Sequence, residues 1–155
     1  MYNKPIIGFD EAKGAIEAMV KEVRSNTERY WQHACMVIAD NNGVPVCIAK
    51  LDKSSYQSYE QALRRARTSG LWGIDTSTFH GLVNKRDWSE QTYGPDYTVC
   101  HGGVAIVPPE YEGSKAGMPV CLGGIGVSGA GEFSIDDELA RIGLEYIKSI
   151  LWPSK

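Results

Sequence analysis

Apolar residues recur at three- and four-residue spacing in four stretches of the chain, the pattern of a helix with one buried face. The spacing predicts a first helix over about residues 10 to 28, with Asp10 as its N-cap, and a last helix over about 135 to 151. It also predicts a second helix within "SYEQALRRARTSG", ended by Gly70, and a third around "TSTFHGLVN".

Short apolar runs rich in β-forming residues lie between these helices. "ACMVIAD" and "VPVCIAKL" predict two antiparallel strands, and the turn sequence Asn41-Asn42-Gly43 between them suits a tight hairpin. "YTVCHGGVAIVPP" and "MPVCLGGIGVSG" are broken by glycine and bounded by proline, and they predict three more strands. The order of elements indicates an α+β fold, with a single five-stranded antiparallel sheet flanked by helices.

Composition narrows the class of protein. A length of 155 residues fits one domain, 1–155, and a net charge of -3 gives no electrostatic reason to bind nucleic acid or a membrane surface. No stretch has the length and apolarity of a signal peptide or a membrane span, which predicts a cytoplasmic protein with a small-molecule partner. The four cysteines form no C-x-x-C pair. We expect all four to be reduced thiols that pack in the interior.

Gly124-x-Gly126-x-x-Gly129 has the spacing of a dinucleotide-binding loop. Such a loop needs a following helix and a further parallel strand, and the 26 residues after Gly129 hold only a turn and one helix. Acidic residues in the first turn of that helix would also repel a phosphate. The sequence therefore argues against a nucleotide site, and we expect the glycines to bend the strand or to admit a ligand or a neighbouring chain.

Three segments carry a resemblance to a known family. "NNGVPVCIAKLD", "ALRRARTSG" and "GGIGVSGAGEFSIDDELARIG" are similar to the first hairpin, a helix motif and the closing motif of the GlcG/HbpS-like heme-binding proteins, which include the C-terminal domain of PduO-type proteins. The similarity covers roughly residues 8 to 148. It implies a five-stranded sheet with profilin-like layering, a homo-oligomer, and heme or corrinoid as ligand, with many members encoded beside catabolic genes.

Two positions depart from the family pattern. A lysine of the family is Arg65 here, which keeps the charge but does not release a proton near neutral pH. On the predicted second helix, Arg65 falls beside the buried stripe, where a guanidinium could hold a carboxylate or a heme propionate. The residue before Gly102 and Gly103 is small in the family but is His101 here.

His101 is the first functional candidate, because the two glycines would let a ligand reach its ring and imidazole can ligate heme iron or transfer protons. A histidine bonded to a nearby carbonyl explains the same sequence equally well. His80, at the end of the predicted third helix, is a second candidate ligand, and Gly102, Gly103 and Gly129 could line the cofactor site.

Acidic and aromatic residues complete the candidates. Ser134 and Asp137 have the spacing of a capping box, so the acids from Asp136 onward are expected to stabilise a helix start. Glu132 lies outside that pattern and could act as a base or touch a ligand. Trp88 and Tyr93, in the polar segment 85–96, could stack on a planar ligand.

Two hypotheses remain open. The first is a cytoplasmic protein that binds heme or another planar tetrapyrrole, with His101 as axial ligand and Arg65 as propionate partner. The second is a cofactor-independent enzyme of a catabolic pathway acting on a small organic acid or aromatic metabolite. In the second, Arg65 holds the anion, His101 is the acid and base, and Glu132 assists.

Overall fold

The computed structural model describes residues 4–87, 94–112 and 120–154. Its helices are α1 (Phe9–Ser25), α2 (Tyr56–Trp72), α3 (Thr76–Lys85) and α4 (Phe133–Leu151). Its strands are β1 (Cys35–Asp40), β2 (Pro45–Lys50), β3 (Gly103–Ile106) and β4 (Gly123–Ser128), and a short 3-10 turn, η2 (Pro109–Tyr111), follows β3.

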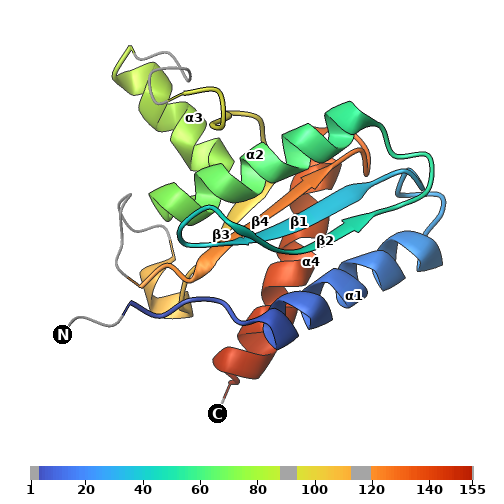
Figure 1. Cartoon of the computed structure of the whole chain (residues 1–155), viewed down its shortest axis with the longest axis horizontal. Coiled ribbons are helices and arrows are strands. Elements are labelled where there is room, and N and C mark those ends of the chain that lie inside the picture. The colour runs from blue at the N-terminus through green and yellow to red at the C-terminus, as the bar shows by residue number, and fades with distance from the viewer. Residues whose placement is uncertain (1–3, 88–93, 113–119, 155) are drawn as a thin grey trace.

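The strands form one antiparallel sheet in the order β2-β1-β4-β3. Figure 1 shows α2 lying across one face of this sheet and α1 and α4 covering the other, so the fold has three layers. Of the helices within the described residues, none has the length and apolar character needed to cross a bilayer.

Strand β1 shows how the sequence produces these layers. Successive side chains of a strand point to opposite faces. Cys35, Val37 and Ala39 belong to the cluster with α2, whereas Met36 and Ile38 belong to the larger core with α1 and α4. Both faces of the strand are therefore covered, which explains why it reads as a continuous apolar run rather than an alternating one.

The prediction of a fifth strand is wrong for the described residues, in which the sheet has four strands. The run from residue 97 to 109 contributes only β3. Before β3, backbone amides bond to side chains instead of to a strand: Thr98 N–H donates to Thr68 Oγ1, and Cys100 N–H donates to Thr98 Oγ1. Gly102 then takes a positive φ of 113°, which ends the irregular segment just before the sheet begins.

The glycines of the G-x-G pattern explain how α2 packs on the sheet. A Cβ at Gly126 would collide with the backbone carbonyl of Ala62, and one at Gly124 with that of Ala66. A Cβ at Gly70, inside α2, would lie 2.8 Å from the Asp40 carbonyl of β1 and 3.1 Å from the Gly124 amide nitrogen of β4. The glycines thus admit a helix of the same chain, where the sequence suggested a ligand or a neighbouring chain.

The helix boundaries differ in part from those expected. Helix α1 has Gly8 as its N-cap and Asp10 in its first turn, so the N-cap predicted at Asp10 is wrong, and the helix ends at Ser25 before the expected residue 28. Helix α2 continues past Gly70 and ends at Gly73, whose left-handed φ of 69° is that of a C-cap glycine. Helix α4 begins at Phe133 with Glu132 as its N-cap, and no side chain caps it. The capping box predicted for Ser134 and Asp137 is therefore wrong.

The cysteines are all free, and Cys35 and Cys121 are buried as expected.

Candidate functional site

A buried ion pair between Arg65 and Asp136 joins α2 to α4, next to Gly102, the residue that follows His101. Arg65 Nη1 lies 2.9 Å from Asp136 Oδ2, and both side chains are 3% exposed. Arg65 also donates to the carbonyl of Val127, and Asp136 Oδ1 accepts from the Ala130 amide at 2.9 Å. The pair thus holds the end of β4 and the turn before α4 in place.

This geometry corrects the role expected of Arg65. Its guanidinium is enclosed between α2, β4 and α4, and the ring of Phe133 covers it at 5.4 Å. Helical spacing placed Arg65 beside the buried stripe at the edge of a cleft, but the side chain turns inward to meet Asp136. A group so enclosed and already paired is a structural tie and has no free face for a propionate or a substrate carboxylate.

Burial also changes the acidity of Asp136. Loss of water around the carboxylate raises its pKa to about 6, and the Ala130 amide and the Arg65 guanidinium offset that effect only in part. An acid with such a pKa is commonly found at functional sites. Here the carboxylate is enclosed, so its titration bears on stability.

The three glycines predicted to line a cofactor site are closely packed against residues of the same chain. A Cβ at Gly102 would lie 2.9 Å from Arg65 Nη1 and 3.1 Å from the Asp136 Cβ, and one at Gly103 would lie 2.6 Å from the Arg65 carbonyl. Gly129 has a positive φ of 77° in the turn after β4, beside His33. Close packing within the chain therefore accounts for these positions.

The two candidate histidines lie next to each other. His80 is on α3, and His101 is in the segment before β3, and their ring centroids are 6.1 Å apart at an interplanar angle of 65°. Both side chains are partly exposed. Among the described residues, no hydrogen bond or ion pair involves either imidazole, so the ring nitrogens are available to a ligand.

The remaining candidates do not join this pair. Glu132 is exposed and is the N-cap of α4, and its side chain makes no capping hydrogen bond. Trp88 and Tyr93 lie outside the described residues. Within those residues, no group of three or more His, Cys, Asp and Glu side chains is placed to hold a metal ion.

A pocket of about 310 Å³ lies between α4, β3 and the link from α2 to α3. Its lining includes the apolar residues Ile74, Val107 and Leu144, and also Tyr111. Neither His80 nor His101 lines it. We call this hollow the α4 pocket.

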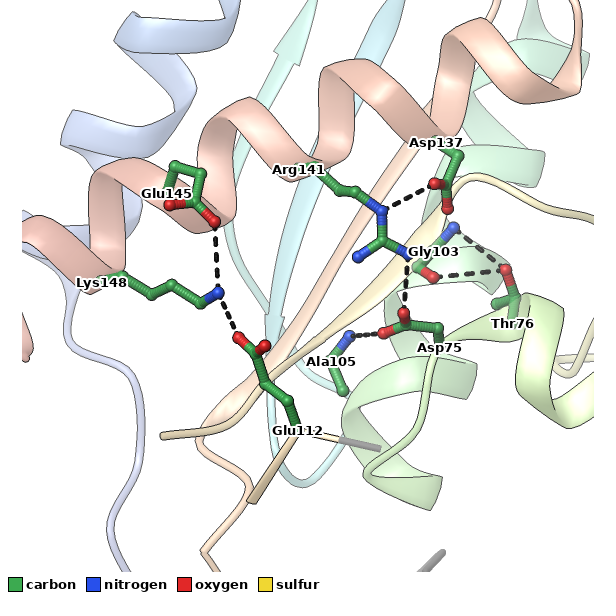
Figure 2. Close-up of polar contacts among 9 residues, drawn as sticks. All are labelled: Asp75, Thr76, Gly103, Ala105, Glu112, Asp137, Arg141, Glu145 and Lys148. Atoms are coloured by element: carbon green, nitrogen blue, oxygen red, sulfur yellow. Dashed lines mark hydrogen bonds and ion pairs between the residues drawn. The ribbon is translucent and has the colours of Figure 1, made fainter. Parts of the chain in front are cut away.

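Two cations of α4 face the α4 pocket, and each is held by two acids (Figure 2). Arg141 donates to Asp75 and to Asp137, each at 2.8 Å. Lys148 bonds to Glu145 at 3.2 Å and to Glu112. Burial lowers the pKa of both cations, but the carboxylates raise it by more, so the pKa of Arg141 and of Lys148 is raised overall.

Sequence reasoning missed both arrangements for the same reason. Asp136 and Arg65 are 71 positions apart, and Arg141 and Asp75 are 66 apart, so no local spacing links them. One signal was present: Arg141 follows Asp137 by four residues on a predicted helix, the spacing of an ion pair. That spacing alone does not indicate a pocket.

Comparison with known proteins identifies the fold and the family. The structure is similar to a double mutant of HbpS from Streptomyces reticuli (TM-score 0.74, 23% identity, covering 94% of this chain and 89% of that one). It is also similar to the Klebsiella pneumoniae protein ORFY (0.78, 18%, 97% and 96%) and to PduOC in complex with heme (0.72, 17%, 91% and 94%).

Comparison with curated protein sequences gives no match. The family described as "Haem degrading protein HbpS-like" matches residues 7–145, which is nearly the whole chain. The resemblance seen in the hairpin and in the closing motif is therefore confirmed. This chain belongs to the HbpS-like family.

Proposed function

We propose that this chain is a small-ligand-binding protein whose ligand is heme or a related planar tetrapyrrole, bound in the cytoplasm at His80 and His101. The observation that carries the proposal is the pairing of two partly exposed imidazoles, from segments 21 positions apart, with no hydrogen bond to the described residues. Family membership supports the same ligand class, because one structural relative is a heme complex.

The chemistry of these side chains fits the group. An imidazole nitrogen is a common axial ligand of heme iron, and it must be unprotonated and free of other bonds to serve as one. His101 precedes Gly102, which has no side chain that could screen its ring. When bound, heme would supply redox chemistry, and the residues of this chain would hold and orient it.

Arg65 has no part in this proposal. The propionate partner expected there is buried and paired with Asp136, so the fit depends on the imidazoles. The alternative enzyme also required Arg65 as its anion clamp and Glu132 close to His101. In the part of the chain that the structure describes, the Arg65 guanidinium is buried and paired with Asp136, so the anion clamp is missing and we do not carry that alternative further.

Titration of the full chain with hemin tests the proposal. The expected result is a stoichiometric shift of the Soret band that needs more hemin in His101→Ala and is lost when His80 is replaced as well. His33→Ala is the matched control, since His33 stacks on Trp31 and takes no part in the pair. Absence of a shift, or a shift that survives removal of both His80 and His101, overturns the proposal.

A further inference from the structure

The α4 pocket is separate from the histidine pair, and the proposed heme function leaves it without a role. It combines an apolar floor with charged side chains at its rim, which is the usual construction of a site for a small organic molecule. Its volume of about 310 Å³ is at the lower end of the range for such sites. The charges at its rim determine which class of ligand it favours.

Negative charge is in excess at this rim. The lining includes the cations Arg141 and Lys148 and the carboxylates of Asp75, Glu112 and Glu145. A fourth carboxylate, Asp137, is bonded to Arg141. Because each cation is already shared between two acids, the local field favours an additional positive charge and opposes an additional negative one.

The acids differ in how firmly they are held. Asp75 accepts from the Ala105 amide at 3.0 Å as well as from Arg141, so both of its oxygens are occupied. Within residues 4–87, 94–112 and 120–154, Glu145 and Glu112 bond to Lys148 alone, and their side chains are 69% and 46% exposed. An exposed carboxylate with a single partner can turn to a ligand at little conformational cost.

The apolar residues of the α4 pocket would contact the uncharged part of a ligand. Ile74, Val107 and Leu144 contribute aliphatic side chains to the lining. Tyr111 also lines the pocket, and an aromatic ring attracts a cation. A ligand that satisfied both parts would have an apolar body and a positively charged end.

We propose that the α4 pocket binds a small organic cation, an amine whose ammonium group bonds to Glu145 and Glu112 and whose apolar body lies on Ile74, Val107 and Leu144. Binding is non-covalent and does not depend on heme. The competing arrangement, in which a ligand carboxylate displaces the glutamates from Lys148 and Arg141, is an outcome of the experiment below.

Two probes of matched shape distinguish the signs of charge. The unliganded full chain is titrated with 2-phenylethylamine and, separately, with 3-phenylpropionate, while the methyl resonances of Ile74, Val107 and Leu144 are followed by NMR. We expect saturable shifts with the amine and none with the acid. Shifts with the acid alone, with both probes equally, or with neither overturn the proposal.

Variants at the rim test the assigned roles. Glu145→Gln is expected to weaken amine binding by about tenfold, since a hydrogen bond to a charged group contributes at least that much. Glu17→Gln is the matched control, because Glu17 is a similarly exposed acid paired with a lysine on α1. It is expected to leave the affinity unchanged.

Lys148→Met is expected to change the affinity for the amine in the opposite direction. Removing this cation frees Glu112 and Glu145 while the aliphatic part of the side chain is kept, so the amine is expected to bind more tightly. A site built for carboxylates would lose affinity for them in the same variant. Weaker amine binding in Lys148→Met contradicts the proposal, and neither result bears on whether the histidine pair binds heme.

Discussion

Arg65 Nη1 lies 2.9 Å from Asp136 Oδ2, and through this contact the middle of α2 is tied to the first turn of α4. The two helices lie on opposite faces of the sheet, so the pair passes the end of β4, where Arg65 also bonds to the Val127 carbonyl. Both charges are out of contact with water. The stability of the fold should therefore depend on the pair being complete.

Removing one partner should be strongly destabilising. Asp136→Ala leaves the Arg65 guanidinium buried without its counter-charge and the Ala130 amide without an acceptor, and we expect a loss of about 3–5 kcal/mol in the free energy of unfolding. Urea denaturation at pH 7.5 measures it. Arg64→Ala, one residue away on the partly exposed side of α2, should change the free energy by less than about 0.5 kcal/mol.

The double variant Arg65→Met with Asp136→Leu should recover much of that loss. Replacing both charges with apolar side chains removes the unpaired charge, and such replacements are often neutral or stabilising. If Asp136→Ala alone were as stable as the wild type, the pair would not have the structural role assigned here.

The raised pKa of Asp136 predicts a dependence of stability on pH. Its folded-state pKa of about 6 lies above the ordinary value of about 3.9 for an unfolded chain, so the folded protein holds the proton more tightly. The contribution is complete below pH of about 4 and is lost as the pH rises through about 6. The direction is opposite to that of an ordinary salt-bridged aspartate.

Comparison with Asp136→Asn isolates this effect from the other titrating groups. The free energies of unfolding of both proteins are measured from pH 4 to pH 7.5. The wild type should lose stability relative to Asp136→Asn as the pH rises across this range. A constant difference, or a difference of the opposite sign, would show that burial does not control the titration of this carboxylate.

The glycines of β4 should tolerate no side chain. A Cβ at Gly126 meets the Ala62 carbonyl, which belongs to the backbone of α2 and cannot move aside, so Gly126→Ala should destabilise the fold by about 1–3 kcal/mol. Gly81→Ala is the control. Its Cβ meets nothing within 4 Å, and alanine is the better helix former, so thermal unfolding of this variant should occur at the same temperature or higher.

The chain is predicted to form a homo-oligomer, as the family resemblance implies. Strand β2 lies at one edge of the sheet, and Ile48 on it and Val44 before it are largely exposed. An exposed apolar edge strand is a surface that a second copy can cover. Light scattering after size exclusion should give a mass above that of one 17.0 kDa chain. A single species of that mass would refute the prediction.

Local patterns predicted the helices and the first hairpin well. In the hairpin, Asp40 Oδ1 accepts from the amides of Asn42 and Val44, and Gly43 takes the positive φ that the turn sequence implied. The fifth strand failed because the choice between a ladder and an irregular segment at residues 97–102 depends on Thr68, which is distant in the sequence. Apolar residues alone do not encode that choice.

The site was predictable only in part. His101 and His80 were each proposed from local features, and the fold brings them together. The role of Arg65 was missed because helical periodicity gives the direction of a side chain and not the partner that it meets. Asp136 was correctly assigned to a helix start, but its role as the buried partner of Arg65 was missed.

The central claim is that His80 and His101 form a heme-binding pair. The most direct test is the hemin dissociation constant of the wild type, His80→Ala, His101→Ala and the double variant, measured by Soret absorbance with His33→Ala as control. We expect His101→Ala to weaken binding by at least about tenfold, a difference of 1.4 kcal/mol, and the double variant to bind no hemin specifically. Equal dissociation constants in all five proteins would contradict the claim.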